Sequence, residues 1–216
     1  MATGVKICGI SSLATARTAI EGGADFLGFI HFARSPRHLG LEAMAELMRL
    51  IRAGARKTPL VSVVVDPDDA LLDRLADEVR PDLVQLHGEE TPQRVADIAG
   101  RFPIPLIKAI GVGDASDLAR GAAYAAHVRH LMFDARPPPG ATLPGGIGLS
   151  FDWTLLHGHD SASPWFLAGG LTPENVARAV KSSGASIVDV SSGVESAPGV
   201  KDAGLISRFL QQAKSV

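Results

Sequence analysis

The chain has 216 residues, a net charge of −2 at neutral pH and a single cysteine, Cys8. Its 21 basic residues are scattered along the sequence and balanced by 23 acidic ones, which argues against a nucleic acid as partner. One cysteine excludes an internal disulfide framework and a zinc site built from several thiolates.

Short apolar runs alternate with helix-like stretches along the chain. We expect strands at residues 5–8, 26–30, 60–65, 83–86, 106–110, 131–133, 166–168 and 187–190. We expect helices at residues 12–21, 41–53, 68–79, 91–99, 115–128, 173–183 and 203–214. Most of the apolar runs are too continuous for strands with one exposed face, as in a parallel sheet buried on both faces. About eight strand–helix units predict an α/β fold, a single (β/α)8 TIM barrel over residues 1–216, rather than a flavodoxin-like sheet of about five strands.

No apolar run approaches the ~20 residues that a membrane helix needs, and the first residues lack the apolar core of a signal peptide. We therefore expect a cytoplasmic protein with no membrane partner. The sequence leaves open whether it is a monomer or a homodimer. The longest irregular segment, residues 137–148, follows the sixth expected strand. Loops of this length in compact domains are usually functional lids or mobile segments.

Polar residues follow many of the expected strands at the point where each strand ends. Because the carboxyl ends of barrel strands meet at one rim, where barrel active sites are built, we expect these residues to gather at one mouth. They are Cys8, Arg37, Asp66, His87, Lys108, Asp134, Ser191 and Ser192.

Two turns near the end of the chain predict a phosphate site. Each is an apolar run that breaks into small residues, and together they contain Gly169, Gly170, Ser192 and Gly193. Side-chain-poor turns let backbone N–H groups close on an anion, and barrels often place a phosphate after their last two strands. A glycine-rich turn taken alone is usually only a turn, but two at this spacing predict a phosphorylated small-molecule substrate. The turn at residues 146–148 is a weaker candidate.

Several motifs in order along the chain resemble those of the phosphoribosylanthranilate isomerase family. The resemblance runs from Lys6 to Asp202, nearly the whole chain. It implies a (β/α)8 barrel of tryptophan biosynthesis that converts N-(5-phosphoribosyl)anthranilate to 1-(2-carboxyphenylamino)-1-deoxyribulose 5-phosphate by an Amadori rearrangement. The motifs include Lys6-Ile7-Cys8-Gly9, Ser35-Pro36-Arg37, Val84-Gln85-Leu86-His87-Gly88, Ala168-Gly169-Gly170-Leu171 and Val188-Asp189-Val190-Ser191-Ser192-Gly193.

The resemblance implies that Cys8 is the general base and Asp134 the general acid. Without it, a free cysteine is more often a small buried hydrophobe, and an aspartate after a strand is more often a turn former. The base requires a favoured thiolate, for which Lys6 and nearby backbone N–H groups are candidate sources. The acid requires a pKa well above the ~3.9 reference, which burial beneath residues 137–148 would provide.

The same resemblance implies that Arg37 faces the anthranilate carboxylate, a planar group that suits a guanidinium fork. Asp189 has two interpretations, as a group that orients the sugar hydroxyls or as a structural hydrogen-bond hub. We expect no organic cofactor and no metal. The pairs His127/His130 and His157/His159 lack a third ligand of fixed geometry.

One departure from the family pattern lies at Gly145-Gly146-Ile147-Gly148, where the family usually has threonine in place of Ile147. Ile147 has no hydroxyl group, so the contact that threonine would make is lost. The sequence does not determine whether the substrate range is broader as a result. The nearest alternative enzyme is the histidine-pathway isomerase that performs the same rearrangement, with Asp expected in place of Cys8. A noncatalytic phosphate-ligand-binding barrel is the alternative of another class; it would have no activity to lose when Cys8 or Asp134 is replaced.

Overall fold

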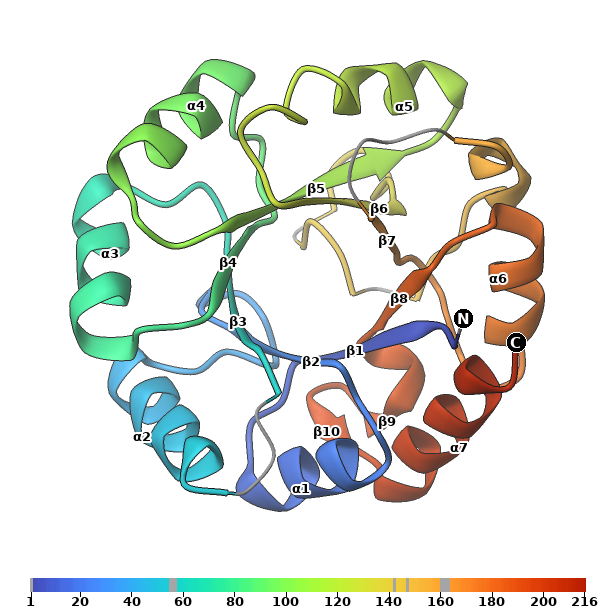
Figure 1. Cartoon of the computed structure of the whole chain (residues 1–216), viewed down its shortest axis with the longest axis horizontal. Helices are drawn as coiled ribbons and strands as arrows, with labels where there is room; N and C mark the ends of the chain where they lie inside the picture. The colour runs from blue at the N-terminus through green and yellow to red at the C-terminus, as the bar shows by residue number, and fades with distance from the viewer. Residues whose placement is uncertain (1, 55–57, 142, 147, 160–163) are drawn as a thin grey trace.

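The computed structural model describes residues 2–54, 58–141, 143–146, 148–159 and 164–216. Eight parallel strands close into a barrel in chain order, with each strand hydrogen-bonded to the next and β8 returning to β1. Figure 1 shows this ring of strands surrounded by helices. The predicted TIM barrel is therefore confirmed. The strands are β1 (Gly4–Cys8), β2 (Phe26–Ile30), β3 (Leu60–Val64), β4 (Leu83–Leu86), β5 (Leu106–Val112), β6 (His130–Ala135), β7 (Phe166–Leu167) and β8 (Ile187–Val190).

The helices lie between the strands, on the outside of the ring. The α-helices are α1 (Leu13–Glu21), α2 (Leu41–Arg52), α3 (Asp69–Arg74), α4 (Pro92–Arg101), α5 (Ala115–Gly121), α6 (Val176–Ser183) and α7 (Ala203–Lys214). A π-helical turn, η1 (Leu75–Val79), continues α3, and a 3-10 turn, η2 (Trp153–Leu156), lies between β6 and β7. Side-chain caps begin several helices, as where Thr91 accepts from the Arg94 N–H before α4.

Two predicted helices are shorter than expected. The helix expected over 115–128 ends at Gly121 and continues as tight turns, in which the Tyr124 N–H donates to the Gly121 carbonyl. These turns bring the Tyr124 hydroxyl to the Glu90 carbonyl, 3.0 Å away. The helix expected from Pro173 begins at Val176, because the Asn175 amide bonds both the Thr172 N–H and the Gly170 carbonyl and holds this segment as a turn.

A two-stranded hairpin that the sequence analysis did not predict follows β8. After a 3-10 turn, η3 (Ser192–Val194), β9 (Glu195–Ala197) pairs with β10 (Val200–Lys201). The turn between them contains Gly199, whose φ of 81° lies in the left-handed region that favours glycine. The hairpin carries Glu195 and Lys201 beside the barrel mouth.

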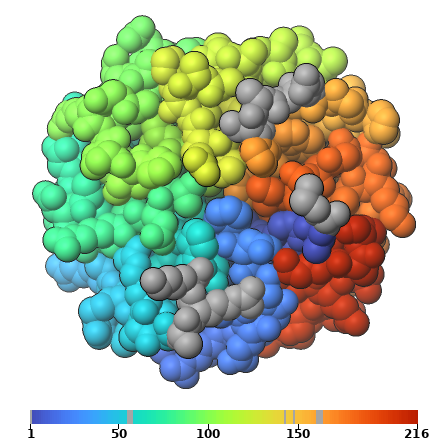
Figure 2. All heavy atoms as spheres, in the orientation of Figure 1, coloured from blue at the N-terminus to red at the C-terminus, as the bar shows by residue number. Residues whose placement is uncertain are grey.

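The barrel interior changes from apolar to polar along its axis. One apolar cluster includes Ile107, Met132 and Phe166, which alternate along their strands with residues that pack against the helices. Lys6 and Asp189, paired across β1 and β8, are buried on neighbouring strands. On the face seen in Figure 2, atoms cover the barrel axis.

Among the helices in the described part of the chain, none combines the length and the apolar character that crossing a membrane requires.

Candidate active site

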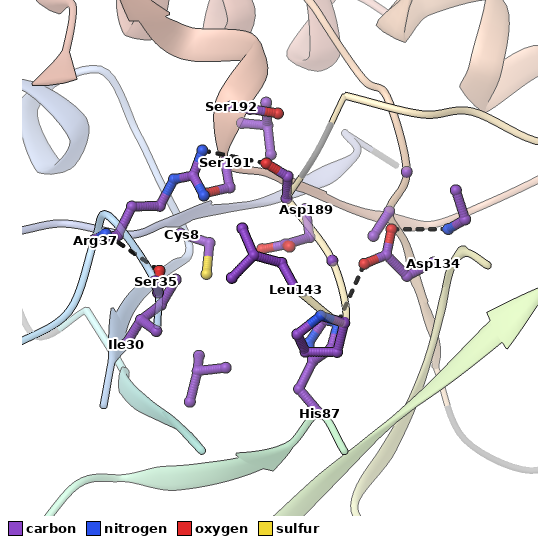
Figure 3. Close-up of a pocket in the computed structure, with 18 of the residues that line it drawn as sticks. Cys8, Ile30, Ser35, Arg37, His87, Asp134, Leu143, Asp189, Ser191 and Ser192 are labelled. Atoms are coloured by element: carbon purple, nitrogen blue, oxygen red, sulfur yellow. Dashed lines mark hydrogen bonds and ion pairs between the residues drawn. The ribbon is translucent and has the colours of Figure 1, made fainter. Parts of the chain in front are cut away.

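A pocket lies at the carboxyl ends of the strands and collects most of the residues that the sequence analysis placed there (Figure 3). Two predicted rim residues lie elsewhere. Asp66 lines a neighbouring hollow, and Lys108 is buried in an ion pair with Glu90, 2.6 Å away. The predicted residues that line the pocket are Cys8, Arg37, His87, Asp134, Gly169, Gly170, Asp189, Ser191, Ser192 and Gly193.

Cys8 ends β1 with its thiol directed into the pocket (Figure 3). Gly28 on β2 leaves room for it, since a Cβ there would lie 2.8 Å from the Cys8 Sγ and 2.9 Å from the Lys6 Nζ. Burial raises the pKa of the Cys8 thiol above its ordinary value, although the Lys6 charge acts in the opposite direction. Lys6 therefore favours the thiolate as expected, but desolvation outweighs it.

Lys6 is fully buried, and its ammonium donates to Asp189 Oδ1 at 2.8 Å. Burial alone would lower the pKa of Lys6, but the Asp189 carboxylate holds it above its ordinary value. Asp189 is thus an ion-pair partner beneath the pocket, which is the structural interpretation of this residue. It also lines the pocket, so the second interpretation, an orienter of sugar hydroxyls, stays open.

Asp134 projects from β6 on the opposite side of the pocket from Cys8 (Figure 3). The residue is buried, as the sequence analysis expected, and the Ala135 N–H donates to its Oδ1 at 2.8 Å. Its Oδ2 lies 3.2 Å from the Nε2 of His87. The loop after β6 covers this contact, because a Cβ on Gly145 would lie 2.7 Å from both of these atoms.

Arg37 is buried at the pocket edge and is held by Glu195 of the hairpin. Its Nε and one terminal nitrogen donate to the two Glu195 oxygens at 2.7 and 2.8 Å. Lys201 donates to the same carboxylate at 2.6 Å. Burial would raise the pKa of Glu195, but the hydrogen bonds from Arg37 and Lys201 hold it below its ordinary value. The other terminal nitrogen, Nη1, donates to no acceptor among the described residues, so its two N–H donors can bind a ligand.

The two predicted phosphate turns lie side by side in the pocket lining, where Gly193 packs directly against the Leu171 carbonyl group. Gly169 and Gly170 have φ angles of 87° and 64°, and a Cβ on Gly169 would lie 2.7 Å from the Ala135 backbone nitrogen. Within the residues that the structure describes, the backbone N–H groups of Gly169, Gly170, Ser192 and Gly193 donate to no protein acceptor. Such groups suit an anion.

Two other sequence observations have simple structural outcomes. Ile147, the departure from the family pattern, lies outside the described residues. His130 is buried against Phe26 and Phe166 and bonds the Pro164 carbonyl, while His127 is exposed.

Several residues of the site were missed by the sequence analysis. Gln85 stood within a quoted motif but carried no signal of its own, because it lies inside a strand, and Glu195 begins β9 of the hairpin that was not predicted. Lys201 lies beyond the last strand, in the hairpin that was not predicted. Leu143 and Gly145 belong to the irregular segment 137–148, which the sequence did mark as functional.

Comparisons with known proteins show which family this chain resembles over its length. The sequence model of the family described as N-(5'phosphoribosyl)anthranilate (PRA) isomerase matches residues 5–212. The N-(5'-phosphoribosyl)anthranilate isomerase of Caulobacter sp. (strain K31) is 54% identical over 211 residues, which cover 98% of each chain. That of Parvibaculum lavamentivorans is 48% identical, with 99% of each chain covered.

Solved structures of proteins with the same description are also similar to this chain. The phosphoribosyl anthranilate isomerase of Thermotoga maritima has a TM-score of 0.86 at 34% identity and covers 99% of this chain and 100% of its own. Another, in complex with reduced 1-(o-carboxyphenylamino)-1-deoxyribulose 5-phosphate, has a TM-score of 0.82 at 34% identity, with the same coverage.

Proposed function

The chain belongs to the N-(5'-phosphoribosyl)anthranilate isomerase family, enzymes of tryptophan biosynthesis, and from that premise we propose that it rearranges N-(5-phosphoribosyl)anthranilate to 1-(2-carboxyphenylamino)-1-deoxyribulose 5-phosphate. One observation carries the proposal. A thiol from β1 and a carboxyl group from β6 face the same pocket, as an acid and a base acting on one small sugar must. The reduced product bound by a related enzyme supports the same chemistry.

Asp134 begins the reaction by protonating the furanose ring oxygen. The C1–O bond breaks, its electron pair stays on the oxygen, and the nitrogen lone pair forms an iminium at C1. The iminium acidifies the C2 proton, which the Cys8 thiolate removes, and the electron pair of that bond returns towards nitrogen. The resulting enolamine becomes the ketone by tautomerisation. Since the iminium is the electron sink, this mechanism calls for no organic cofactor or metal.

The two ends of the substrate bind on different walls of the pocket. Arg37 binds the anthranilate carboxylate through Nη1, while Glu195 holds the rest of the guanidinium fork. The phosphate lies between the N–H groups of Gly169, Gly170, Ser192 and Gly193. Asp189 reaches the sugar hydroxyls with the oxygen that Lys6 does not bond. In this proposal residues 1–216 act as one catalytic domain; its cytoplasmic location and the choice between monomer and homodimer stay predictions.

Replacing the base tests the proposal directly. Purified protein is mixed with freshly generated phosphoribosylanthranilate, and loss of substrate fluorescence is followed. We expect Cys8→Ala to lower kcat by at least about 100-fold, the usual loss when a general base is removed. Calorimetric binding of the reduced product is the control, since the variant keeps Arg37 and the phosphate turns and retains its affinity. Unchanged turnover in Cys8→Ala would remove the role, and an inactive wild type that binds the reduced product would favour the noncatalytic barrel.

A further inference from the structure

A second hollow adjoins the pocket, and the two share part of their lining, including His87. The pocket has a free volume of about 80 Å³, and the second hollow one of about 490 Å³. Both are lined by His87 and Asp134. Arg34, Glu89 and Ala141, which also line the second hollow, are exposed, so water reaches the imidazole from that side.

The His87 ring is fixed at both nitrogens. Nδ1 lies 2.7 Å from the Gln85 amide nitrogen, and Nε2 lies 3.2 Å from Asp134 Oδ2. Gln85 is almost fully buried, and its Oε1 has no partner among the described residues. A side-chain amide can serve both protonation states of the ring: its NH₂ donates to a neutral Nδ1, and after a half-turn its oxygen accepts from a protonated one.

The proposed mechanism leaves a proton imbalance after every turnover. Asp134 ends with one proton too few, because it gave one to the ring oxygen. Cys8 ends with one too many, because it took one from C2. The isomerisation consumes no proton overall, so a proton must reach Asp134 and another must leave Cys8 before the next cycle.

This inference rests on the proposed function. We propose that His87 acts through Asp134 by returning a proton to its carboxylate after each turnover. The Nε2–H bond of the imidazolium breaks, the proton bonds to Asp134 Oδ2, and the electron pair stays on Nε2. A water molecule of the second hollow then protonates Nε2 of the neutral imidazole and becomes hydroxide. The proton that leaves Cys8 neutralises this hydroxide, so the solvent neither gains nor loses a proton over the cycle. The charged side chains that share the second hollow with His87 are Arg34, Asp66 and Asp134, together with Glu89.

Removing the imidazole tests the relay. We expect His87→Ala to lower kcat by about tenfold or more while KM changes by less than about threefold, because Arg37 and the phosphate turns are unchanged. Added imidazole, which fits the vacated site beside the second hollow, is expected to restore kcat in a saturable way. It should not raise kcat of the wild type or of Asp134→Ala. The exposed His127→Ala is the matched control and keeps wild-type kcat.

A second variant distinguishes loss of the proton relay from a general disturbance of the pocket. In Gly145→Ala the new Cβ would lie 2.7 Å from both Asp134 Oδ2 and His87 Nε2, so the pair must separate while both groups remain. We expect kcat to fall there without rescue by imidazole. A wild-type kcat in His87→Ala would overturn the relay. So would a loss of kcat that imidazole does not restore, provided that the variant unfolds at the same temperature as the wild type. If the wild type turns over phosphoribosylanthranilate in the same assay, the proposed function holds even when the relay fails.

Discussion

Cys8 is a buried thiol whose protonation is set by opposing neighbours. Desolvation raises its pKa, Lys6 and Lys201 act to lower it, and Asp189 acts to raise it. A thiol with a raised pKa is rarely ionised at neutral pH, but the thiolate, once formed, is a stronger base. The residue therefore combines a low population of the active form with high intrinsic reactivity towards the C2 proton.

This balance predicts the pH at which the thiol ionises. Below the pKa of Cys8 the thiolate fraction grows tenfold per pH unit, so the thiolate absorbance of the protein is expected to rise from pH 7 to pH 9. Because burial raises the pKa, the rise continues past about pH 8.5, the ordinary value for cysteine. Cys8 is the single cysteine, so the ultraviolet absorbance of the thiolate reports its titration alone, with Cys8→Ser as the blank. A thiolate absorbance that is already level at pH 7 would contradict the raised pKa.

The sequence could predict those site residues that combine a reactive side chain with a position at the end of a strand. Cys8 and Asp134 each end or nearly end a strand, so position alone brings them to the rim. Lys108 was expected at the rim too, but it lies near the start of β5, where it pairs with Glu90 and stays buried. The bend of the β4–α4 connection that brings Glu90 to it could not be predicted from the sequence. Burial and partner choice depend on contacts between distant segments.

At the scale of elements, the β9–β10 hairpin determines how Arg37 is presented. Glu195 lies 158 positions from Arg37 along the chain, and no local pattern links them. The turn residues Pro198 and Gly199 were visible in the sequence, but a hairpin after the last strand has no place in the alternating strand–helix pattern. The eight strands were predictable because continuous apolar runs are a local signal; this insertion was not.

Replacing Glu195 tests this dependence. In Glu195→Gln the side chain keeps its shape but loses the charge that holds both Arg37 and Lys201, so we expect KM to rise about tenfold and kcat to change by less than about threefold. Arg37→Ala should raise KM at least as much. Steady-state kinetics of the two variants and of the double variant measure the coupling. An unaltered KM in Glu195→Gln would show that the hairpin does not act through Arg37.

For the whole molecule, buried ion pairs between the strands and the surrounding loops make its stability sensitive to single changes. The Lys108–Glu90 pair is buried, and Glu90 also accepts from the backbone N–H groups of Asp66 and Gly88. The pair thus joins β5 to the loops after β3 and β4. Removing one charge leaves the other unpaired in a medium of low polarity.

We expect Lys108→Met to lower the free energy of unfolding by about 3–5 kcal/mol, since Glu90 remains buried and charged. The double variant Lys108→Met/Glu90→Gln should recover part of the loss, because no unpaired charge remains. Urea unfolding of both variants provides the measurement, with the exposed pair Arg49–Glu46 as the control, where loss of one partner costs less than about 1 kcal/mol. A similar small loss for Lys108→Met would mean that water reaches the pair.

The barrel is joined least firmly at β7, which has only the two residues Phe166 and Leu167. The turn after it and the turn after β8 both present N–H groups that have no acceptor within the described part of the chain. An anion bound by both turns would link the end of β7 to the end of β8 and so strengthen the barrel where its strand is shortest. In a cell, the supply of this metabolite would then govern the lifetime of the folded enzyme as well as its flux.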